Sequence, residues 1–242
     1  MTNPRGKINL ITLGCSKNLV DSERLLNQFS LNGFEAIHDS SDASADIVII
    51  NTCGFIDAAK EESIDTILQY AAARKRGTLK KLLVMGCLSE RYSRELAQEI
   101  PEVDKFYGKF DFRSIIADLN ASFFEHKFYS RLQTTPSHFA YLKISEGCNR
   151  TCSFCAIPQF TGKYRSRQPE SLIDEAHALA DTGVKELLLI AQDLTYYGID
   201  LCGKSRLADL LCRLADVDGI DRIRLHYTFP AGFPLDVLDV IN

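Results

Sequence analysis

Residues 139–155 read FAYLKISEGCNRTCSFC, in which a short apolar strand runs directly into three cysteines spaced CxxxCxxC. Further apolar strand patterns follow along the chain, separated by helical patterns. Such alternation is typical of a β/α series built on a parallel sheet. In this part of the chain we expect strands at 139–144, 186–191 and 222–227, helices at 169–181 and 207–215, and the start of another helix at 235–241.

The N-terminal part of the chain shows the same alternation and predicts an open parallel α/β sheet. Residues 45–51 (ADIVIIN) are nearly all apolar, as expected for a strand whose two faces are both covered by helices. The helical pattern at 90–99 stops just before Pro101, which favours a helix end there. We expect strands at 7–13, 45–51 and 81–85, and helices at 20–31, 57–74, 90–99 and 113–120.

The periodicity breaks between residues 121 and 137, which predicts a domain boundary. The expected organisation is an N-terminal α/β domain at 1–125, a linker at 126–137 and a second domain at 138–242. This second domain shows only three β/α units, and the open edge of such a sheet would expose unpaired backbone groups. We therefore expect either that the chain is a fragment or that another chain or domain completes the sheet.

The composition limits the class of protein. The chain has 242 residues, of which 45% are hydrophobic and 25% charged, enough for one large or two modest domains with a buried core. A net charge of −4 gives no general argument for nucleic-acid binding. No apolar run approaches the roughly 20 residues of a membrane span. Residues 1–7 lack the apolar stretch of a secretory signal, so we expect a cytoplasmic protein without membrane contact and with no indicated RNA contact.

Cys148, Cys152 and Cys155 lie within eight residues on a loop that directly follows an expected strand. Thiolates are the soft ligands that iron–sulfur clusters and zinc select, and a reduced cytoplasmic chain is not expected to pair them as disulfides. A structural zinc ion would need a fourth protein ligand. His138 and His177 are poorly placed for that role, one before the strand and one on the following helix. The pattern favours an iron–sulfur cubane with one open iron, with zinc as the alternative.

Cys15, Cys53 and Cys87 are far apart in sequence, yet each follows the carboxyl end of an expected strand and has a glycine beside it. In an open parallel sheet these strand ends gather along the edge where ligands bind. Helix N-termini at that edge favour thiolates and an anionic cluster. We interpret the three as ligands of a second cluster; the alternative is three separate buried cysteines. Cys202 and Cys212 show no such pattern, and we interpret Cys202 as incidental and Cys212 as a core residue.

The CxxxCxxC loop, with Phe154 before its third cysteine, resembles the radical S-adenosylmethionine enzymes. Joined to an N-terminal domain with three strand-end cysteines, it resembles the methylthiotransferases of that superfamily, which attach a methylthio group at an unactivated C–H bond. Residues 14–23 (GCSKNLVDSE), 191–193 (AQD) and 225–227 (LHY) resemble the branch that modifies an aspartate of a small-subunit ribosomal protein. The resemblance covers the chain from Lys7 to its end.

The resemblance implies that the second domain is the first half of a radical S-adenosylmethionine β/α barrel. In the family a small substrate-binding β-barrel domain follows, and it is absent from this sequence. The resemblance also implies two [4Fe–4S] clusters, one on each cysteine triad. S-adenosylmethionine would bind the open iron held by the CxxxCxxC loop and be split to a 5′-deoxyadenosyl radical. The other cluster would present the methylated sulfur.

The resemblance further implies which residues surround S-adenosylmethionine. The candidates are Phe154, Glu186, Gln192 and Asp193; the alternatives are an ordinary charge at a strand start for Glu186 and a loop turn for Gln192 and Asp193. Thr161 stands where many relatives carry an arginine, and Arg165 and Arg167 are candidates to replace its anion contact. Beside Cys15, the residues Lys17, Asn18 and Asp21 are candidates to shape the cavity around the second cluster. Residues 18–22 also match a helix N-terminus, and capping is the preferred interpretation.

The implied reaction is transfer of a methylthio group to the β carbon of an aspartate in a small-subunit ribosomal protein, with an external electron donor and sulfur source. One alternative is a tRNA adenosine methylthiotransferase of the same family. That branch carries Gln-Met-Asn-like and Gly-Gln-Asn segments where this chain has residues 16–18 and 191–193. The other alternative is a non-catalytic fragment that binds zinc or a cluster. With half of the barrel absent, we expect no full activity from the chain alone.

Overall fold

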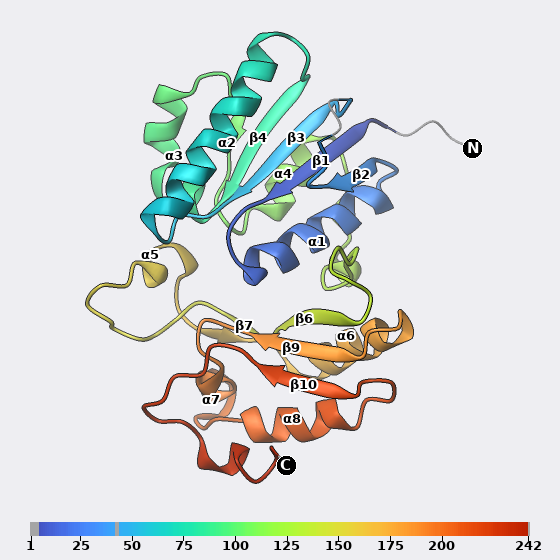
Figure 1. Cartoon of the computed structure of the whole chain (residues 1–242), viewed down its shortest axis with the longest axis vertical. Helices are drawn as coiled ribbons and strands as arrows, with labels where there is room; N and C mark the ends of the chain where they lie inside the picture. Colours follow the sequence, from blue (N-terminus) through green and yellow to red (C-terminus); the bar gives the residue numbers. More distant parts are fainter. Residues whose placement is uncertain (1–4, 42–43, 242) are drawn as a thin grey trace. The chain divides into compact units, whose positions relative to one another are not determined.

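The computed structural model describes residues 5–41 and 44–241, which divide between two units (Figure 1). One unit ends at Leu132 and the other begins at Gln133, within the segment 126–137. Each unit is built around a parallel sheet with helices packed on it. The expected α/β class, with an open parallel sheet in the N-terminal unit, is confirmed.

The N-terminal unit contains a five-stranded parallel sheet in the order β2-β1-β3-β4-β5. Its strands are β1 (Lys7–Thr12), β2 (Glu35–His38), β3 (Ile47–Thr52), β4 (Lys81–Gly86) and β5 (Lys105–Phe106). Its helices are α1 (Ser16–Leu31), α2 (Asp57–Lys75), α3 (Cys87–Glu99) and α4 (Phe112–Asp118), followed by the 3₁₀ turn η1 (Glu125–Lys127).

Side-chain alternation along β3 divides the core of this unit into two layers. Ile49 belongs to a cluster formed with residues of α1 and α4, whereas Val48 and Ile50 belong to a cluster formed with residues of α2 and α3. Figure 1 shows the two helix pairs on opposite faces of the sheet. A sheet covered on both faces explains why β3 is apolar at nearly every position.

Some element boundaries differ from those expected. Helix α1 begins at Ser16, four residues before the expected start, because its first turn (SKNL) is mostly polar and shows little apolar periodicity. Helix α3 likewise begins at Cys87 rather than at residue 90. The strands β2 and β5 were not expected; both lie at the edges of the sheet and have four and two residues, too few for a clear alternating pattern.

The C-terminal unit contains a three-stranded parallel sheet in the order β10-β9-β6. Its strands are β6 (Phe139–Lys143), β9 (Glu186–Ile190) and β10 (Arg222–Leu225), and its main helices are α6 (Pro169–Asp181) and α8 (Leu207–Ala215). Short elements lie in the connections: β7 (Ser145–Glu146), α5 (Ile157–Thr161), β8 (Arg165–Ser166), η2 (Leu194–Tyr196), α7 (Ile199–Cys202) and η3 (Leu235–Val237). The helix expected at 235–241 is therefore only a 3₁₀ turn at η3.

Helix α8 shows that the interpretation of Cys212 as a core residue is wrong. The helix buries an apolar face made of Leu207, Leu210, Leu211 and Leu214. Cys212 falls on the opposite side of the helix and is exposed. Cys202 is exposed as well, at the end of α7.

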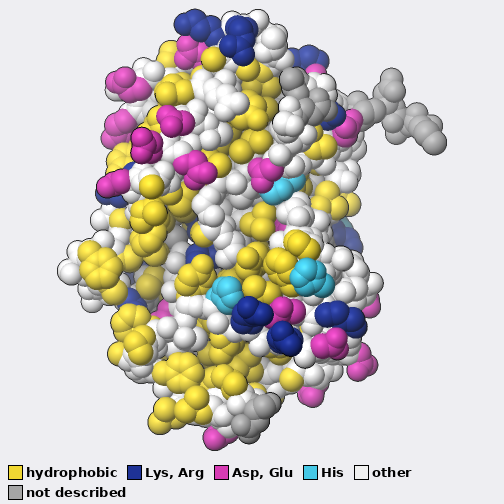
Figure 2. Space-filling view, in the orientation of Figure 1, with side chains coloured by type: hydrophobic (Ala, Val, Ile, Leu, Met, Phe, Trp, Pro, Cys, Tyr) yellow, Lys and Arg dark blue, Asp and Glu magenta, His cyan; other side chains and the backbone are white. Residues whose placement is uncertain are grey.

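Figure 2 shows hydrophobic side chains gathered on one part of the surface of the C-terminal unit. Beyond β10, the exposed large apolar side chains of the unit are Tyr227, Phe229, Leu235, Leu238 and Ile241. This unit therefore presents apolar surface next to its last strand. None of the helices within residues 5–41 and 44–241 has the length and apolarity needed to cross a membrane.

Asp104 links β4 to helix α2, and its contacts predict that the stability of the N-terminal unit depends on pH. Its carboxylate accepts hydrogen bonds from the Leu82 backbone N–H at 2.7 Å and from two nitrogens of Arg74 at 2.8 and 2.9 Å. The Arg74 hydrogen bonds, followed by that of Leu82, outweigh burial and lower the pKa of Asp104 below its usual 3.8. A lowered folded-state pKa contributes stability above the unfolded-state value, and that stability is lost as the pH falls through the folded-state value.

We expect Asp104→Asn to cost about 1 kcal/mol of unfolding free energy near neutral pH, since solvent partly screens the pair. The difference between wild type and variant should shrink as the pH falls from about 5 towards 3. Urea unfolding at a series of pH values measures it. A difference that stays constant over that range would contradict the assigned role of Asp104.

Candidate metal centres

The first triad lies at the carboxyl edge of the N-terminal sheet, after three adjacent strands. Strands β1, β3 and β4 are neighbours, with Thr12 paired to Asn51 and Thr52 paired to Gly86. Cys15, Cys53 and Cys87 follow these strands respectively. In the order β2-β1-β3-β4-β5 the direction of chain winding reverses between β1 and β3, which is where open α/β sheets bind ligands.

Glycines allow the cysteine-bearing loops to approach one another. Gly14 has a φ of +89°, and a Cβ atom added there would lie 2.5 Å from Cys53 Cβ and 2.7 Å from Cys53 Sγ. A Cβ on Gly54 would lie 2.8 Å from the Leu88 backbone. Contacts this short exclude any side chain, so the glycines beside the cysteines are required by the convergence of the loops.

Asn18 connects the strand ends around this triad. Its Nδ2 donates to the carbonyl oxygens of Leu13 at 3.0 Å and Thr52 at 3.1 Å, and Cys87 Sγ donates to its Oδ1 at 3.9 Å. Its own carbonyl oxygen accepts from Asn51 Nδ2 at 3.0 Å. The expected capping role is wrong: Cys15 occupies the N-cap position of α1, and Asn18 is a buried bridge between loops.

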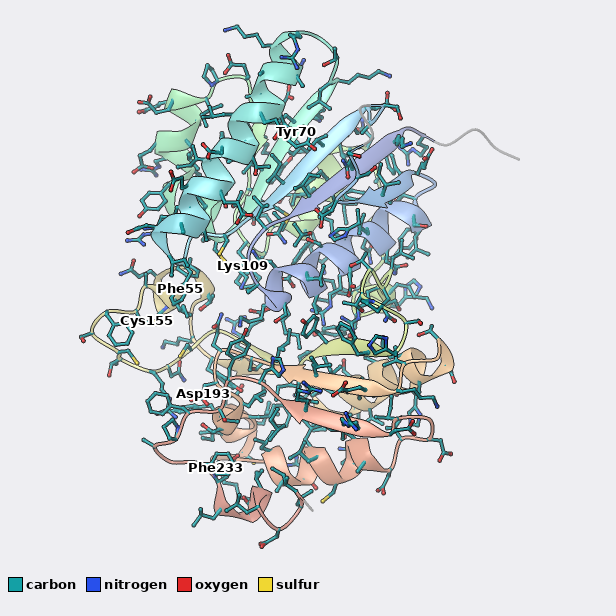
Figure 3. The ribbon with its side chains drawn as sticks, viewed as in Figure 1. Phe55, Tyr70, Lys109, Cys155, Asp193 and Phe233 are labelled. Carbon is teal, nitrogen blue, oxygen red and sulfur yellow. The ribbon has the colours of Figure 1, made fainter. Side chains whose placement is uncertain are left out.

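Burial and nearby positive charge have opposite effects on the pKa values of the thiols in this triad. Burial raises the pKa of Cys87 to about 12, and the cationic Lys109 nearby lowers it in part. Burial also raises the pKa of Cys53. Figure 3 labels Lys109 at this edge of the N-terminal unit, where α1 and α3 begin at Ser16 and Cys87. Metal binding must displace protons from the buried thiols, and helix N-termini with a cation beside them favour the resulting negative charge.

The surroundings of the first triad fit an anionic cluster. Within the described residues, the buried hydroxyl oxygens of Ser16 and Ser89 have no hydrogen-bond partner, and both lie within two positions of a cysteine. A buried polar atom without a partner needs an explanation, and a ligand that binds beside it is one such explanation. Among the described residues of both units, no three His, Cys, Asp or Glu side chains are arranged to hold a single metal ion. A four-iron cubane needs more widely spaced thiolates than one ion does.

The second triad lies on residues 147–164, a loop closed at its base by the antiparallel pair β7–β8. Gly147 has a φ of +76°, and a Cβ there would lie 2.1 Å from the Lys163 carbonyl oxygen, so the two ends of the loop cross closely. The Cys148 N–H donates to the Gly162 carbonyl at 3.1 Å. The loop therefore leaves the carboxyl end of β6 and returns next to it.

Local hydrogen bonds order the cysteines of this loop. The Arg150 backbone N–H donates to Cys148 Sγ at 3.5 Å, and the Cys155 N–H donates to the Cys152 carbonyl oxygen at 3.1 Å. Burial raises the pKa of Cys148, and the Arg150 N–H opposes this rise. Three thiols on one short loop, with an N–H directed at one sulfur, form a donor set suited to a cluster.

The structure separates the four residues expected near S-adenosylmethionine. Gln192 and Asp193 follow β9 at the same sheet edge as the CxxxCxxC loop, and Figure 3 labels Asp193 and Cys155 on this side of the unit. Phe154 is 90% exposed on the loop. Glu186 begins β9 and pairs with Phe139 at the opposite edge, about 13 Å along the strand from Ile190.

Glu186 therefore lies at the wrong end of β9 for a contact with S-adenosylmethionine, and the expectation that it makes one is wrong. Its carboxylate instead accepts hydrogen bonds from Arg224 at 2.6 and 2.9 Å. Arg167 is also committed elsewhere: it is buried, pairs with Glu175 at 2.5 Å and donates to the Lys143 carbonyl at 3.1 Å. It is unsuited to replace an anion contact at Thr161.

Arg150 was not singled out by the sequence pattern, although it lies inside the CxxxCxxC loop. Its Nε donates to Asp193 Oδ2 at 2.6 Å. The one signal that could have identified it is its position between two cysteines of the triad, which does not by itself reveal a partner 43 residues away.

Comparisons with known proteins agree with this arrangement. Residues 7–108 match the model of the uncharacterized protein family UPF0004, and residues 142–241 match that of the radical SAM superfamily. The chain is 54% identical over 98% of its length to the ribosomal protein uS12 methylthiotransferase RimO of Porphyromonas gingivalis. It is 55% identical over 98% of its length to the RimO of Phocaeicola vulgatus, and 54% identical over 99% to that of Cytophaga hutchinsonii. The chain spans 55% of each of these relatives, about half their length.

Solved structures of radical S-adenosylmethionine enzymes share the fold. The methyltransferase TsrM of Kitasatospora setae, solved with cobalamin and a [4Fe–4S] cluster, matches with a TM-score of 0.63 at 14% identity, over 100% of this chain and 59% of that one. The cobalamin-dependent enzyme OxsB matches with a TM-score of 0.54 at 14% identity, over 87% of this chain and 36% of that one. At this identity the match describes the fold alone.

Proposed function

Because the chain belongs to the RimO-like radical SAM methylthiotransferases, we propose that it carries both cluster-binding units of an enzyme that attaches a methylthio group to an aspartate β carbon of ribosomal protein uS12. The observation that carries the proposal is the pair of three-thiol sites, each at the carboxyl edge of its own parallel sheet. Three thiols per site leave one iron of a cubane free for a ligand from outside the protein.

Each cluster would be held by one triad. Cys148, Cys152 and Cys155 would hold the cluster that binds S-adenosylmethionine; the triad of the N-terminal unit is Cys15, Cys53 and Cys87. Bound there, the cluster on the CxxxCxxC loop would supply the electron for cleavage of S-adenosylmethionine, and the cluster on the N-terminal triad would supply the sulfur to be transferred.

The protein's own residues position these groups. The Arg150 N–H directs a hydrogen bond at Cys148 Sγ, and Asn18 fixes the strand ends between Cys15 and Cys87. Gln192 and Phe154 are the proposed contacts of S-adenosylmethionine, from the strand end and the cysteine loop respectively. Lys109 supplies positive charge beside Cys87.

The partners follow from the proposed reaction. The proposed partners are ribosomal protein uS12, an external electron donor and a source of sulfur, and the proposed location is the cytoplasm. The tRNA-modifying alternative is not favoured, because the relatives with 50–55% identity carry the uS12 name. A zinc-only protein is the other competing outcome.

We expect anaerobic reconstitution of the chain to yield about eight irons and matching sulfide, with little zinc. The reconstituted chain with a strong reductant and S-adenosylmethionine should form 5′-deoxyadenosine. Because no full activity is expected from the chain alone, the substrate is decided with a protein that carries this chain together with a complete barrel and the substrate-binding domain of the family. Incubation of that protein with uS12 or with tRNA should give a mass increase corresponding to a methylthio group in place of hydrogen. Zinc without sulfide would refute the proposed chemistry, and modification of tRNA alone would refute the proposed substrate.

A further inference from the structure

Arg150 extends from the CxxxCxxC loop into a site built by two other segments of the C-terminal unit. Its Nε donates to Asp193 Oδ2 at 2.6 Å. Its Nη2 donates to Thr195 Oγ1 at 3.4 Å and to the Ala231 carbonyl oxygen at 3.3 Å. The guanidinium thus joins the cysteine loop to the segment after β9 and to the segment after β10.

Two aromatic rings enclose the same guanidinium. Its central carbon lies 3.8 Å from the centroid of the Phe229 ring and 5.0 Å from that of Tyr196. Arginine favours such stacking because its planar cation is weakly hydrated. These contacts leave the Arg150 side chain only 19% exposed, although it belongs to a loop.

Asp193 is held as firmly as its partner. Its side chain is 4% exposed. Its Oδ1 accepts from the Thr195 backbone N–H at 3.0 Å and from Thr195 Oγ1 at 2.6 Å, while its Oδ2 accepts from Arg150. Both carboxylate oxygens are therefore engaged within the protein, and the group is oriented towards the cysteine loop rather than towards an open space.

We propose that Arg150 and Asp193 form a clamp that fixes the CxxxCxxC loop against the carboxyl ends of β9 and β10, so that the loop keeps the shape that holds its cluster. This inference rests on the proposed cluster at Cys148, Cys152 and Cys155. It makes Asp193 a positioning residue that acts through Arg150, in place of the direct contact with S-adenosylmethionine expected from the sequence.

The clamp reaches the cluster site through the backbone of Arg150. The same residue whose guanidinium is held by Asp193 donates its N–H to Cys148 Sγ at 3.5 Å. Hydrogen bonds to cluster sulfurs and outer contacts of the ligands tune both the retention and the reduction potential of a cluster. Loss of the clamp should free this N–H, loosen the loop and shift the potential to a more negative value.

The test uses the reconstituted full chain and the variants Arg150→Gln, Asp193→Asn and their combination. Iron release to a chelator under anaerobic conditions should show a fast phase, for about half of the iron, that is about tenfold faster than in wild type. The double variant should release iron no faster than the single variants, because the two side chains act as one unit. Lys163→Gln, which removes an exposed positive charge from the same loop, should release iron at the wild-type rate.

Two further readouts separate a clamp from a cofactor contact. The midpoint potential of the cluster should fall in Arg150→Gln, which removes a positive charge together with the clamp, whereas the affinity of Asp193→Asn for S-adenosylmethionine, per reconstituted cluster, should stay at the wild-type value. A weakened affinity with unchanged iron release would overturn the clamp. If metal-free Arg150→Gln unfolds at a lower temperature than wild type, Asp193→Asn is the deciding variant, because it leaves the sequence of the loop intact. Iron release from Asp193→Asn at the wild-type rate would refute the clamp, and faster release would support it. Failure of wild type to assemble iron and sulfide would instead refute the proposed function.

Discussion

Replacing Gly86 by alanine is expected to destabilise the N-terminal unit by roughly 3–5 kcal/mol. Gly86 ends β4 with φ +107° and ψ −165°, a region that only glycine occupies readily. A Cβ atom there would lie 2.5 Å from the Thr52 carbonyl oxygen and 2.6 Å from the Thr52 nitrogen. These are backbone atoms of the adjacent strand β3, so relief of the clash would require part of the central sheet to separate.

The same substitution should reduce iron binding, because Cys87 follows immediately and begins α3. Urea unfolding of the metal-free protein measures the loss of stability, and iron content after reconstitution measures the loss of the site. Gly77→Ala is the matched control. Gly77 also has a positive φ, of +76°, but no atom lies within 4 Å of the Cβ position, so only the conformational cost of about 1 kcal/mol applies. Equal losses for both variants would show that the contact with Thr52 is unimportant.

Replacing Cys148, Cys152 and Cys155 by alanine should lower the iron content from about eight to about four per chain and abolish formation of 5′-deoxyadenosine. Replacing Cys15, Cys53 and Cys87 should lower the iron content equally, but leave that activity in place. The two triads lie on separate units, so the losses of iron should add when all six are replaced.

The control is the double variant Cys202→Ala, Cys212→Ala, which should keep the wild-type iron content. Both thiols are exposed and lie outside the triads. A loss of iron in this control would assign a ligand to the wrong cysteine. Retention of all the iron after loss of either triad would show that its thiols do not hold a cluster.

Several elements could be predicted because the information is local. The strands β3, β4, β6 and β9 are mostly apolar runs of five or six residues, β1 alternates polar and apolar residues, and α6 and α8 match their expected bounds. A residue that ends such a strand must lie at the carboxyl edge of a parallel sheet, whichever strand it neighbours. The position of Cys15, Cys53 and Cys87 at one sheet edge follows from that rule, and so does the start of the CxxxCxxC loop at another.

Other features depend on contacts between distant segments. The pairing of Glu186 with Phe139 put Glu186 at the wrong edge for a cofactor, although it lies within seven residues of Gln192 and Asp193. Cys212 belongs to an apolar helix, but only the packing of α8 decides that its side chain faces outwards.

By itself the sequence determined the two α/β units, the strands that carry the cysteines and the family to which the chain belongs, since each depends on short-range pattern or on spacing. Only the tertiary structure decided that Asn18 bridges three strand ends and that Arg150 is held by Asp193 and Phe229. These contacts join residues that are up to 79 positions apart. Hydrogen bonds and stacking at such separations depend on where folding brings the backbone, which no local periodicity encodes.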